Sequence, residues 1–220
     1  MRAAKTNTEI RQDQIARSAL ALISRNGFQR LNMAGLARKV GVVPSAIYRH
    51  YRNKDEVLDA VLELISQRLL GNVAAARTKS TDALERLERV LMGHVKLIRG
   101  EVPIPRVVFS EAIFTGHRRR RRRIHRMFQE YLGQVADILR EGQRAGCVRA
   151  GLAPETLSVM FLGLVQPPAI LWLLSGGEFD VTRHATCAWQ IFSEMIRVDK
   201  PRPMSTPTHA TTRGRAKNQQ

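Results

Sequence analysis

Cysteine is scarce in this sequence, and long apolar runs are missing. The two cysteines among 220 residues, Cys147 and Cys187, lack the spacing of metal ligands. We therefore expect reduced side chains packed in the structure, and no metal site. No secretory signal pattern and no uninterrupted apolar run of 18 or more residues occurs. These absences predict an intracellular, cytoplasmic protein without a membrane partner.

Patterns that carry catalytic chemistry are also missing. The sequence shows no nucleophile paired with a base, no cluster of metal ligands and no glycine-rich loop of the kind that holds phosphates. We therefore expect no enzymatic activity and no cofactor. Strand signals are poor because period-two alternation is rare, whereas apolar residues recur at helical spacing. The predicted fold class is all-α.

Acidic residues are few, which leaves a large positive charge. The chain has 36 basic and 19 acidic residues, a formal net charge of +17. Residues 1–54 alone hold 11 basic and 2 acidic side chains. A concentration of positive charge in one region favours a polyanionic partner such as nucleic acid.

Residues 31–56 predict two short helices joined by a tight turn, followed by the start of a third. Asn32 can cap the first helix, Gly41 can end it in a left-handed conformation, and Pro44 suits the first position of the next. This is the pattern of a helix-turn-helix, whose second helix lies in a DNA major groove. The residues expected to face inward are Met33, Leu36, Ala37, Val40, Ile47 and Tyr51.

The outward residues of the second helix are the candidates for DNA contact. Arg49 is its only long hydrogen-bond donor, and a bidentate contact to guanine is the contact that such a side chain makes best. Lys54 begins the third helix, where the helix dipole disfavours a cation, so a DNA phosphate is the expected neighbour. The predicted base-reading residues are Pro44, Ser45, Ala46 and Arg49, and the predicted phosphate contacts are Tyr48, His50 and Lys54.

With these motifs, residues 8–70 resemble the DNA-binding domain of the TetR family of bacterial transcriptional regulators. Asn32 and Val43 stand where that family usually has threonine and serine, and the resemblance makes both candidate DNA contacts. It implies a homodimer on a palindromic operator, with two recognition helices about one DNA turn apart. The matching positions are Gly27-Phe28, Leu36-Ala37, Gly41-Val42, Tyr48-Arg49-His50-Tyr51 and Lys54.

The remaining chain is expected to be helical over 81–99, 118–144 and 155–174, the last broken at Pro167-Pro168, with a final helix from about residue 180. The predicted domains are a DNA-binding helix-turn-helix domain with a basic N-terminal arm, a helical effector-binding and dimerisation domain, and a disordered basic tail. Their expected bounds are 1–53, 54–198 and 199–220.

The resemblance implies a small-molecule pocket in the central helices. Few polar residues face inward there, which favours an apolar or aromatic effector. The last helices are too apolar for a monomer surface, which favours self-association. The candidate effector contacts are His94, Phe109, Phe114, Phe128 and Tyr131, and the candidate dimer contacts are Phe161, Leu164, Trp172, Trp189 and Phe192.

A run of six arginines, Arg118 to Arg123, is the least usual feature of the chain. It is expected to be a solvated loop and helix start in the effector domain, far from the recognition helix; the alternative is a second contact with nucleic acid or a membrane surface. The leading functional hypothesis is a ligand-responsive, sequence-specific DNA-binding regulator, a repressor released from its operator by its effector. The alternative is a sequence-independent nucleic-acid-binding or chromosome-architecture protein.

Overall fold

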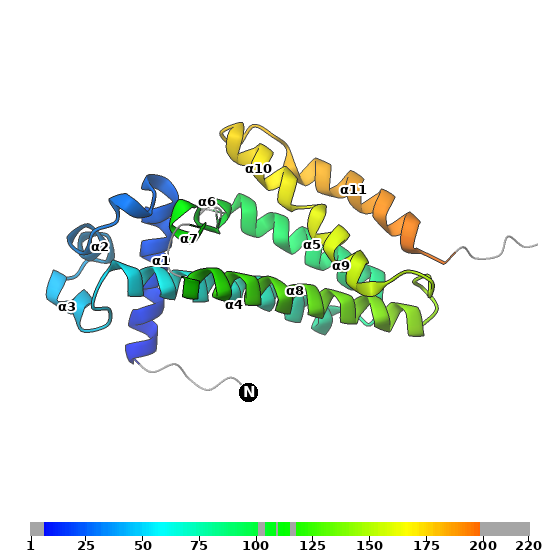
Figure 1. Cartoon of the computed structure of the whole chain (residues 1–220), viewed down its shortest axis with the longest axis horizontal. Coiled ribbons are helices and arrows are strands. Elements are labelled where there is room, and N and C mark those ends of the chain that lie inside the picture. Colours follow the sequence, from blue (N-terminus) through cyan, green and yellow to red (C-terminus); the bar gives the residue numbers. More distant parts are fainter. Residues whose placement is uncertain (1–6, 101–103, 109, 115–117, 199–220) are drawn as a thin grey trace, which may run out of the picture.

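The computed structural model describes residues 7–100, 104–108, 110–114 and 118–198. Within these ranges the regular elements are α-helices and one short 3-10 helix, and the only extended pairing is an isolated bridge between Val148 and Arg197. The predicted all-α fold class is confirmed. Figure 1 shows a small N-terminal group of helices attached to a longer helical body.

The N-terminal group consists of α1 (Asn7–Asn26), η1 (Phe28–Arg30), α2 (Met33–Val40) and α3 (Pro44–Tyr48). The oxygen of the Asn32 side chain accepts a hydrogen bond from Gly35 N at 2.7 Å and so caps α2, as predicted. Gly41 ends α2 with a φ of 80°, a left-handed conformation that costs glycine little. Local sequence therefore sets both ends of α2 and the start of α3.

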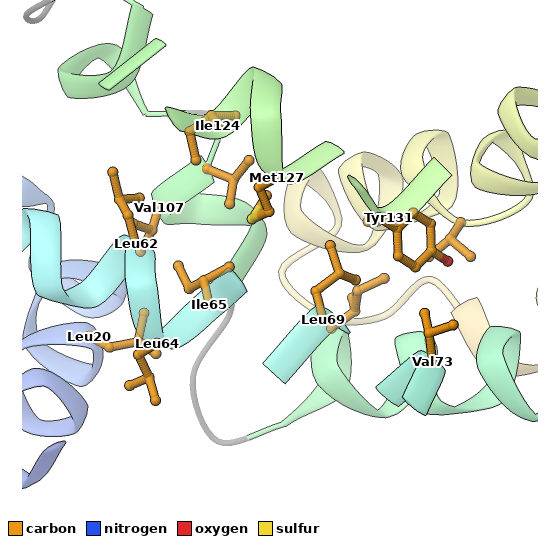
Figure 2. Packing of buried hydrophobic residues seen from close by; sticks show 14 of the residues in the cluster. Leu20, Leu62, Leu64, Ile65, Leu69, Val73, Val107, Ile124, Met127 and Tyr131 are labelled. Carbon is orange, nitrogen blue, oxygen red and sulfur yellow. The ribbon is translucent and has the colours of Figure 1, made fainter. Parts of the chain in front are cut away.

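Helix α4 (Lys54–Lys79) connects the two parts of the molecule. It packs against α1 on one side and against α5 and α8 on the other. In Figure 2, Leu64 lies near Leu20 of α1, whereas Ile65 and Leu69 point towards the side chains of α8. The predicted domain boundary falls at the start of α4, and α4 contributes to the cores on both sides of that boundary.

The body consists of α5 (Ala83–Arg99), α6 (Ile104–Val108), α7 (Glu111–Phe114), α8 (Arg118–Arg144), α9 (Pro154–Gly163), α10 (Gln166–Leu174) and α11 (Val181–Ile196). The bounds of α5, α8 and α11 agree with the predicted helices, whereas α6 and α7 were expected only as one apolar segment. The predicted interruption of 155–174 is present, but it lies at Leu164 and Val165 rather than at the prolines. Pro167 and Pro168 occupy the first turn of α10, where a missing N–H costs little.

The stretch Pro154–Leu174 corrects one expectation from the sequence. Its mean hydropathy of 1.9 is high enough, over sufficient length, for a membrane span. Counting uninterrupted apolar residues missed this because Gln166, Ser158 and the glycine at 163 interrupt the run without lowering its average much. Core helices of soluble proteins meet the same measure. In the structure the stretch is two helices, α9 and α10, rather than one.

Candidate functional site

The outer surface of α3 presents the side chains that the sequence predicted for DNA contact. Ile47 and Tyr51 anchor α3 by pointing inward, and the Tyr51 hydroxyl donates to the carbonyl of Gln12 in α1 at 3.4 Å. Burial raises the pKa of Tyr51, so its hydroxyl keeps its proton. The candidate contacts at this surface are exposed or half-buried: Asn32, Val43, Pro44, Ser45, Ala46, Tyr48, Arg49 and His50.

Lys54 lies at the start of α4, beside this surface. Its Nζ is 5.0 Å from the centre of the Phe28 ring. Such a cation–π contact restrains the ammonium group without neutralising it. The geometry therefore leaves Lys54 charged and half-buried at the end of the molecule that carries α3.

Arg120 corrects the expectation that the arginine run is solvated. Its residue exposure is only 5%. Its Nη2 lies 2.6 Å from Asp55 Oδ1, and its Nε lies 3.3 Å from Asp59 Oδ1. Its guanidinium carbon is also 5.9 Å from the centre of the Phe28 ring. The run is thus fixed to the first two turns of α4, next to the DNA-binding helices.

A helical pattern in the sequence could have revealed this contact. Arg120 continues the apolar stripe that includes Ile124, Met127 and Tyr131, at intervals of three and four residues. Asp55 and Asp59 are likewise one turn apart on α4. Only the packing of α8 on α4 brings the two patterns together, so neither pattern alone identifies the pair.

A small cavity in the body contains two of the predicted effector contacts. It has a volume of about 40 Å³ and is lined by α4, α5, α6, α8 and α10. His94 and Phe128 line it, and Tyr131 lies behind His94. Phe109 lies outside the described residues, as does the side chain of Phe114. The full lining is Ile65, Leu69, His94, Leu97, Ile98, Ile104, Pro105, Val108, Met127, Phe128, Gln166 and Ala169.

The polar groups at this cavity are uncharged. His94 Nδ1 and the Tyr131 hydroxyl share a hydrogen bond of 3.4 Å, and the two rings meet edge to face. Burial lowers the pKa of His94 to about 4 and raises the pKa of Tyr131, since each charged form would lose its hydration. At neutral pH both side chains are therefore neutral, and the cavity suits an apolar ligand.

Three of the predicted dimer contacts lie inside the protomer instead. Phe161 packs edge to face on Trp189 with ring centres 6.4 Å apart, and Phe192 lies 5.9 Å from Phe161. All three are buried, whereas Leu164 and Trp172 are half-buried. Helical spacing placed these aromatics on an apolar stripe, but it could not distinguish a stripe facing the protomer's own core from one facing a partner.

The surface of α9 to α11 nevertheless exposes many apolar side chains. Leu174 is 80% exposed and Ile191 is 72% exposed. A cluster of such residues on one face is typical of a surface that another protein covers. The exposed large apolar residues here, which we call the α9–α11 face, are Val159, Met160, Ile170, Leu171, Leu174, Ile191, Met195 and Val198.

Curated relatives are similar to this chain over most of its length. Nucleoid occlusion factor SlmA of Vibrio atlanticus (strain LGP32) is 25% identical over 195 residues, which are 88% of this chain and 100% of that protein. The fatty acid metabolism regulator protein of Bacillus subtilis (strain 168) is 23% identical over 168 residues, 76% of this chain and 86% of that protein.

Solved structures share the fold. FadR of Bacillus subtilis in complex with stearoyl-CoA has a TM-score of 0.71 at 20% identity, covering 84% of this chain and 98% of that one. KstR2 of Mycobacterium tuberculosis, a ketosteroid transcriptional regulator, has a TM-score of 0.67 at 18% identity, covering 90% and 99%. At these identities the likeness extends to the fold alone.

Two family patterns match along the chain. The family described as bacterial regulatory proteins, tetR family, matches residues 15–61, and the one described as YsiA-like protein, C-terminal region, matches residues 56–194. The second match alone covers more than half of the chain. TetR-family proteins are ligand-responsive DNA-binding regulators and are generally not enzymes. With α2 and α3 forming a helix-turn-helix and α4 to α11 forming the body behind it, the chain belongs to the TetR family of bacterial transcriptional regulators.

Proposed function

We propose that the chain is a cytoplasmic, non-enzymatic repressor that binds a palindromic operator as a homodimer and leaves it when a small apolar or aromatic effector fills the cavity. Residues 1–53 form the proposed DNA-binding domain and residues 54–198 the effector-binding and dimerisation domain. The proposed basic tail, residues 199–220, lies outside the described residues.

Operator binding is assigned to the surface around α3. Arg49 directly follows the last residue of α3; its long donor side chain is exposed, which supports a role in base recognition. Pro44, Ser45 and Ala46 would lie close to base edges, because they form the first turn of α3. The proposed backbone contacts are Asn32, Val43, Tyr48, His50 and Lys54.

The position of the cavity is the observation that carries the proposed response. Ile65 and Leu69 of α4 line it, and the same helix begins at Lys54 beside α3. Sites for small ligands usually measure about 300–1,000 Å³, far above the 40 Å³ of this cavity. A ligand of that size would therefore widen the cavity, and α4 is one of the helices that line it. Its binding then favours a conformation in which α3 is moved relative to the body.

The chemistry of the cavity favours an effector that places a long or flat apolar group in it, with at most one neutral polar contact. His94 and Gln166 are the polar side chains in its lining, and no charged side chain lines it within the described residues. The similar regulator from Bacillus subtilis was solved with stearoyl-CoA, and another similar regulator is named for ketosteroids. The acyl chain of stearoyl-CoA and the ring system of a ketosteroid are apolar, and both support an apolar group in the cavity here.

Dimerisation is assigned to the α9–α11 face. Exposed large apolar side chains occur on all three helices, and pairing two copies about a twofold axis would remove them from water. A twofold dimer also presents two α3 helices to one duplex, as a palindromic operator requires. The half-buried Leu164 and Trp172 stay candidate contacts at its edge.

The test measures release of DNA by defined ligands. An operator selected by the full-length protein from genomic fragments is titrated in the presence of stearoyl-CoA, the free fatty acid, a sterol or choline. We expect an apolar ligand to weaken binding by at least tenfold and choline to have no effect. Ala169→Leu, which fills the cavity, should abolish the response, whereas Met127→Ala, which enlarges it, should preserve it. Release by no apolar ligand, or release that survives Ala169→Leu, would contradict the assigned cavity.

A second candidate function is chromosome-associated binding without an effector. It is supported by the 25% identity to nucleoid occlusion factors and by the net charge of +17. The selection experiment separates the two functions. Enrichment of one palindromic sequence supports the repressor, whereas equal recovery of all genomic fragments supports a sequence-independent binder.

A further inference from the structure

We propose that the outward arginines at the start of α8 bind the phosphate backbone of DNA that flanks the operator. We call Arg118, Arg119, Arg121, Arg122 and Arg126 the arginine face. The inference rests on the proposed operator binding and adds a second, sequence-independent contact surface to it.

The first argument is the position of α8. Arg120 contacts Asp55 and Asp59 near the start of α4, and Arg123 contacts Glu63 one turn further along. At the opposite ends of the two helices, Arg77 of α4 lies 2.8 Å from Glu141 of α8. The helices therefore run parallel, and both begin at the end of the molecule that carries α2 and α3 (Figure 1). The arginine face therefore begins beside the first two turns of α4 rather than deep in the effector domain.

The second argument is how the arginines divide between two sides of one helix. Arg120 is buried against its carboxylates, and a hydrogen bond from Arg123 lowers the pKa of Glu63. Arg120 and Arg123 thus form ion pairs with the acidic side chains of α4 that face them. The five residues of the arginine face are exposed, and within the described part of the chain none has an ion-pair partner. Arg119 and Arg126 border a groove that also includes Asp59, Glu63 and Glu130, whereas Arg118, Arg121 and Arg122 do not line it. Inward contact holds the helix in place, and the charge of these last three residues stays available for a partner.

The third argument is that the carboxylates of α4 pair with only two of the arginines at the start of α8, Arg120 and Arg123, and leave the charge of the arginine face unbalanced. The N-terminus of a helix carries a partial positive charge, which disfavours cations in its first turn. Five neighbouring guanidinium groups also repel one another. Phosphates relieve both effects, and guanidinium binds them in a bidentate geometry.

DNA is favoured over a lipid surface for two reasons. The arginine face lies at the same end as α3, and among the residues that the structure describes no exposed apolar side chain interrupts it to insert into lipid. Contacts to phosphates carry no sequence information, so the arginine face should add affinity that depends on duplex length and salt but not on base sequence.

The experiment compares a minimal selected operator with the same operator extended on both sides by about 10 bp, roughly one helical turn. Full-length protein is titrated by fluorescence anisotropy over a series of salt concentrations. The test variant is Arg121→Gln with Arg122→Gln. The matched control is Lys79→Gln with Arg144→Gln, which removes the same charge from exposed positions at the opposite ends of α4 and α8.

We expect the wild type to bind the extended duplex more tightly and with a steeper salt dependence than the minimal duplex. The test variant should lose that difference. For a dimer that loses two arginines on each flank, this corresponds to about two to four fewer released counterions in the slope. It should bind the minimal operator like the wild type, and the control should retain the whole effect. Such a result leaves operator binding intact, so it tests the arginine face separately from the proposed function.

Three outcomes would overturn the inference. The first is equal loss on minimal and extended duplexes, which would place these arginines within the operator site. The second is an equal effect of the control, which would make net charge the cause. The third is wild-type binding that is independent of flanking length together with arginine-dependent binding to phosphatidylserine vesicles, which would assign the face to a membrane.

Discussion

The DNA-binding helices of this regulator depend on local sequence, whereas its effector body depends on contacts between helices that are far apart in the chain. In α2 and α3, each end is set by a residue within a few positions of it, such as Asn32, Gly41 and Pro44. In the body, the cavity exists only because side chains from five helices meet. Substitutions near α3 should therefore change DNA contacts individually, whereas substitutions in the body should act through packing and assembly.

The largest effect is expected at the α9–α11 face, because loss of the dimer separates the two DNA-binding domains. Ile191→Asp places a charge on an outward side chain next to the buried Phe192. We expect a folded monomer by light scattering and a loss of operator affinity of about 100-fold or more, since linked sites gain 10²–10⁴ in avidity. Ala75→Asp, on the exposed side of α4, should stay dimeric. A dimeric Ile191→Asp protein would move the interface elsewhere.

The stability of the effector body should also depend on pH, because His94 is buried in it. Its pKa is about 4 in the folded protein and about 6.5 when exposed, so the unfolded chain takes up the proton first as pH falls. The free energy of unfolding should therefore decrease as pH falls from about 7 to 4, by about 3 kcal/mol from this residue. Urea unfolding at several pH values measures it. His94→Gln keeps a partner for Tyr131 but cannot titrate, so an identical pH dependence in both proteins would contradict the prediction.

The DNA-binding helices should show a smaller and more selective effect at Arg49. Arg49→Ala should remove about 1–3 kcal/mol of discrimination at one base pair of each half-site. Binding to the selected operator and to its single base-pair variants measures this. If affinity falls equally for every variant, Arg49 contacts phosphate instead of a base.

The smallest effect is expected at Lys54, which is proposed to contact only phosphate. Lys54→Ala should weaken binding to all sequences alike and reduce the slope of log affinity against log salt by about two units, one for each protomer of the dimer. Lys79→Ala, at the other end of α4, is the control and should leave the slope unchanged. An unchanged slope in Lys54→Ala would remove Lys54 from the DNA interface.

Particular residues show how far prediction from sequence extends. The helix bounds, the caps and the outward position of Arg49 follow from local spacing, and the structure has them as expected. His94 and Phe128 line one cavity, whereas their spacing in the sequence identified them only as candidates. Phe161, Trp189 and Phe192 turned inward because periodicity identifies an apolar stripe without identifying what covers it.

The sequence by itself determined the all-α fold, the helix-turn-helix and the family, because each depends on residues within a few turns of one another. Tertiary structure decided which arginine of the run is buried, where the cavity lies and which apolar side chains stay exposed. Those features depend on contacts between helices far apart in the chain, as between Arg120 and Asp55. The energy of such a contact depends on the surroundings that both partners share, and no local pattern in either helix contains that information.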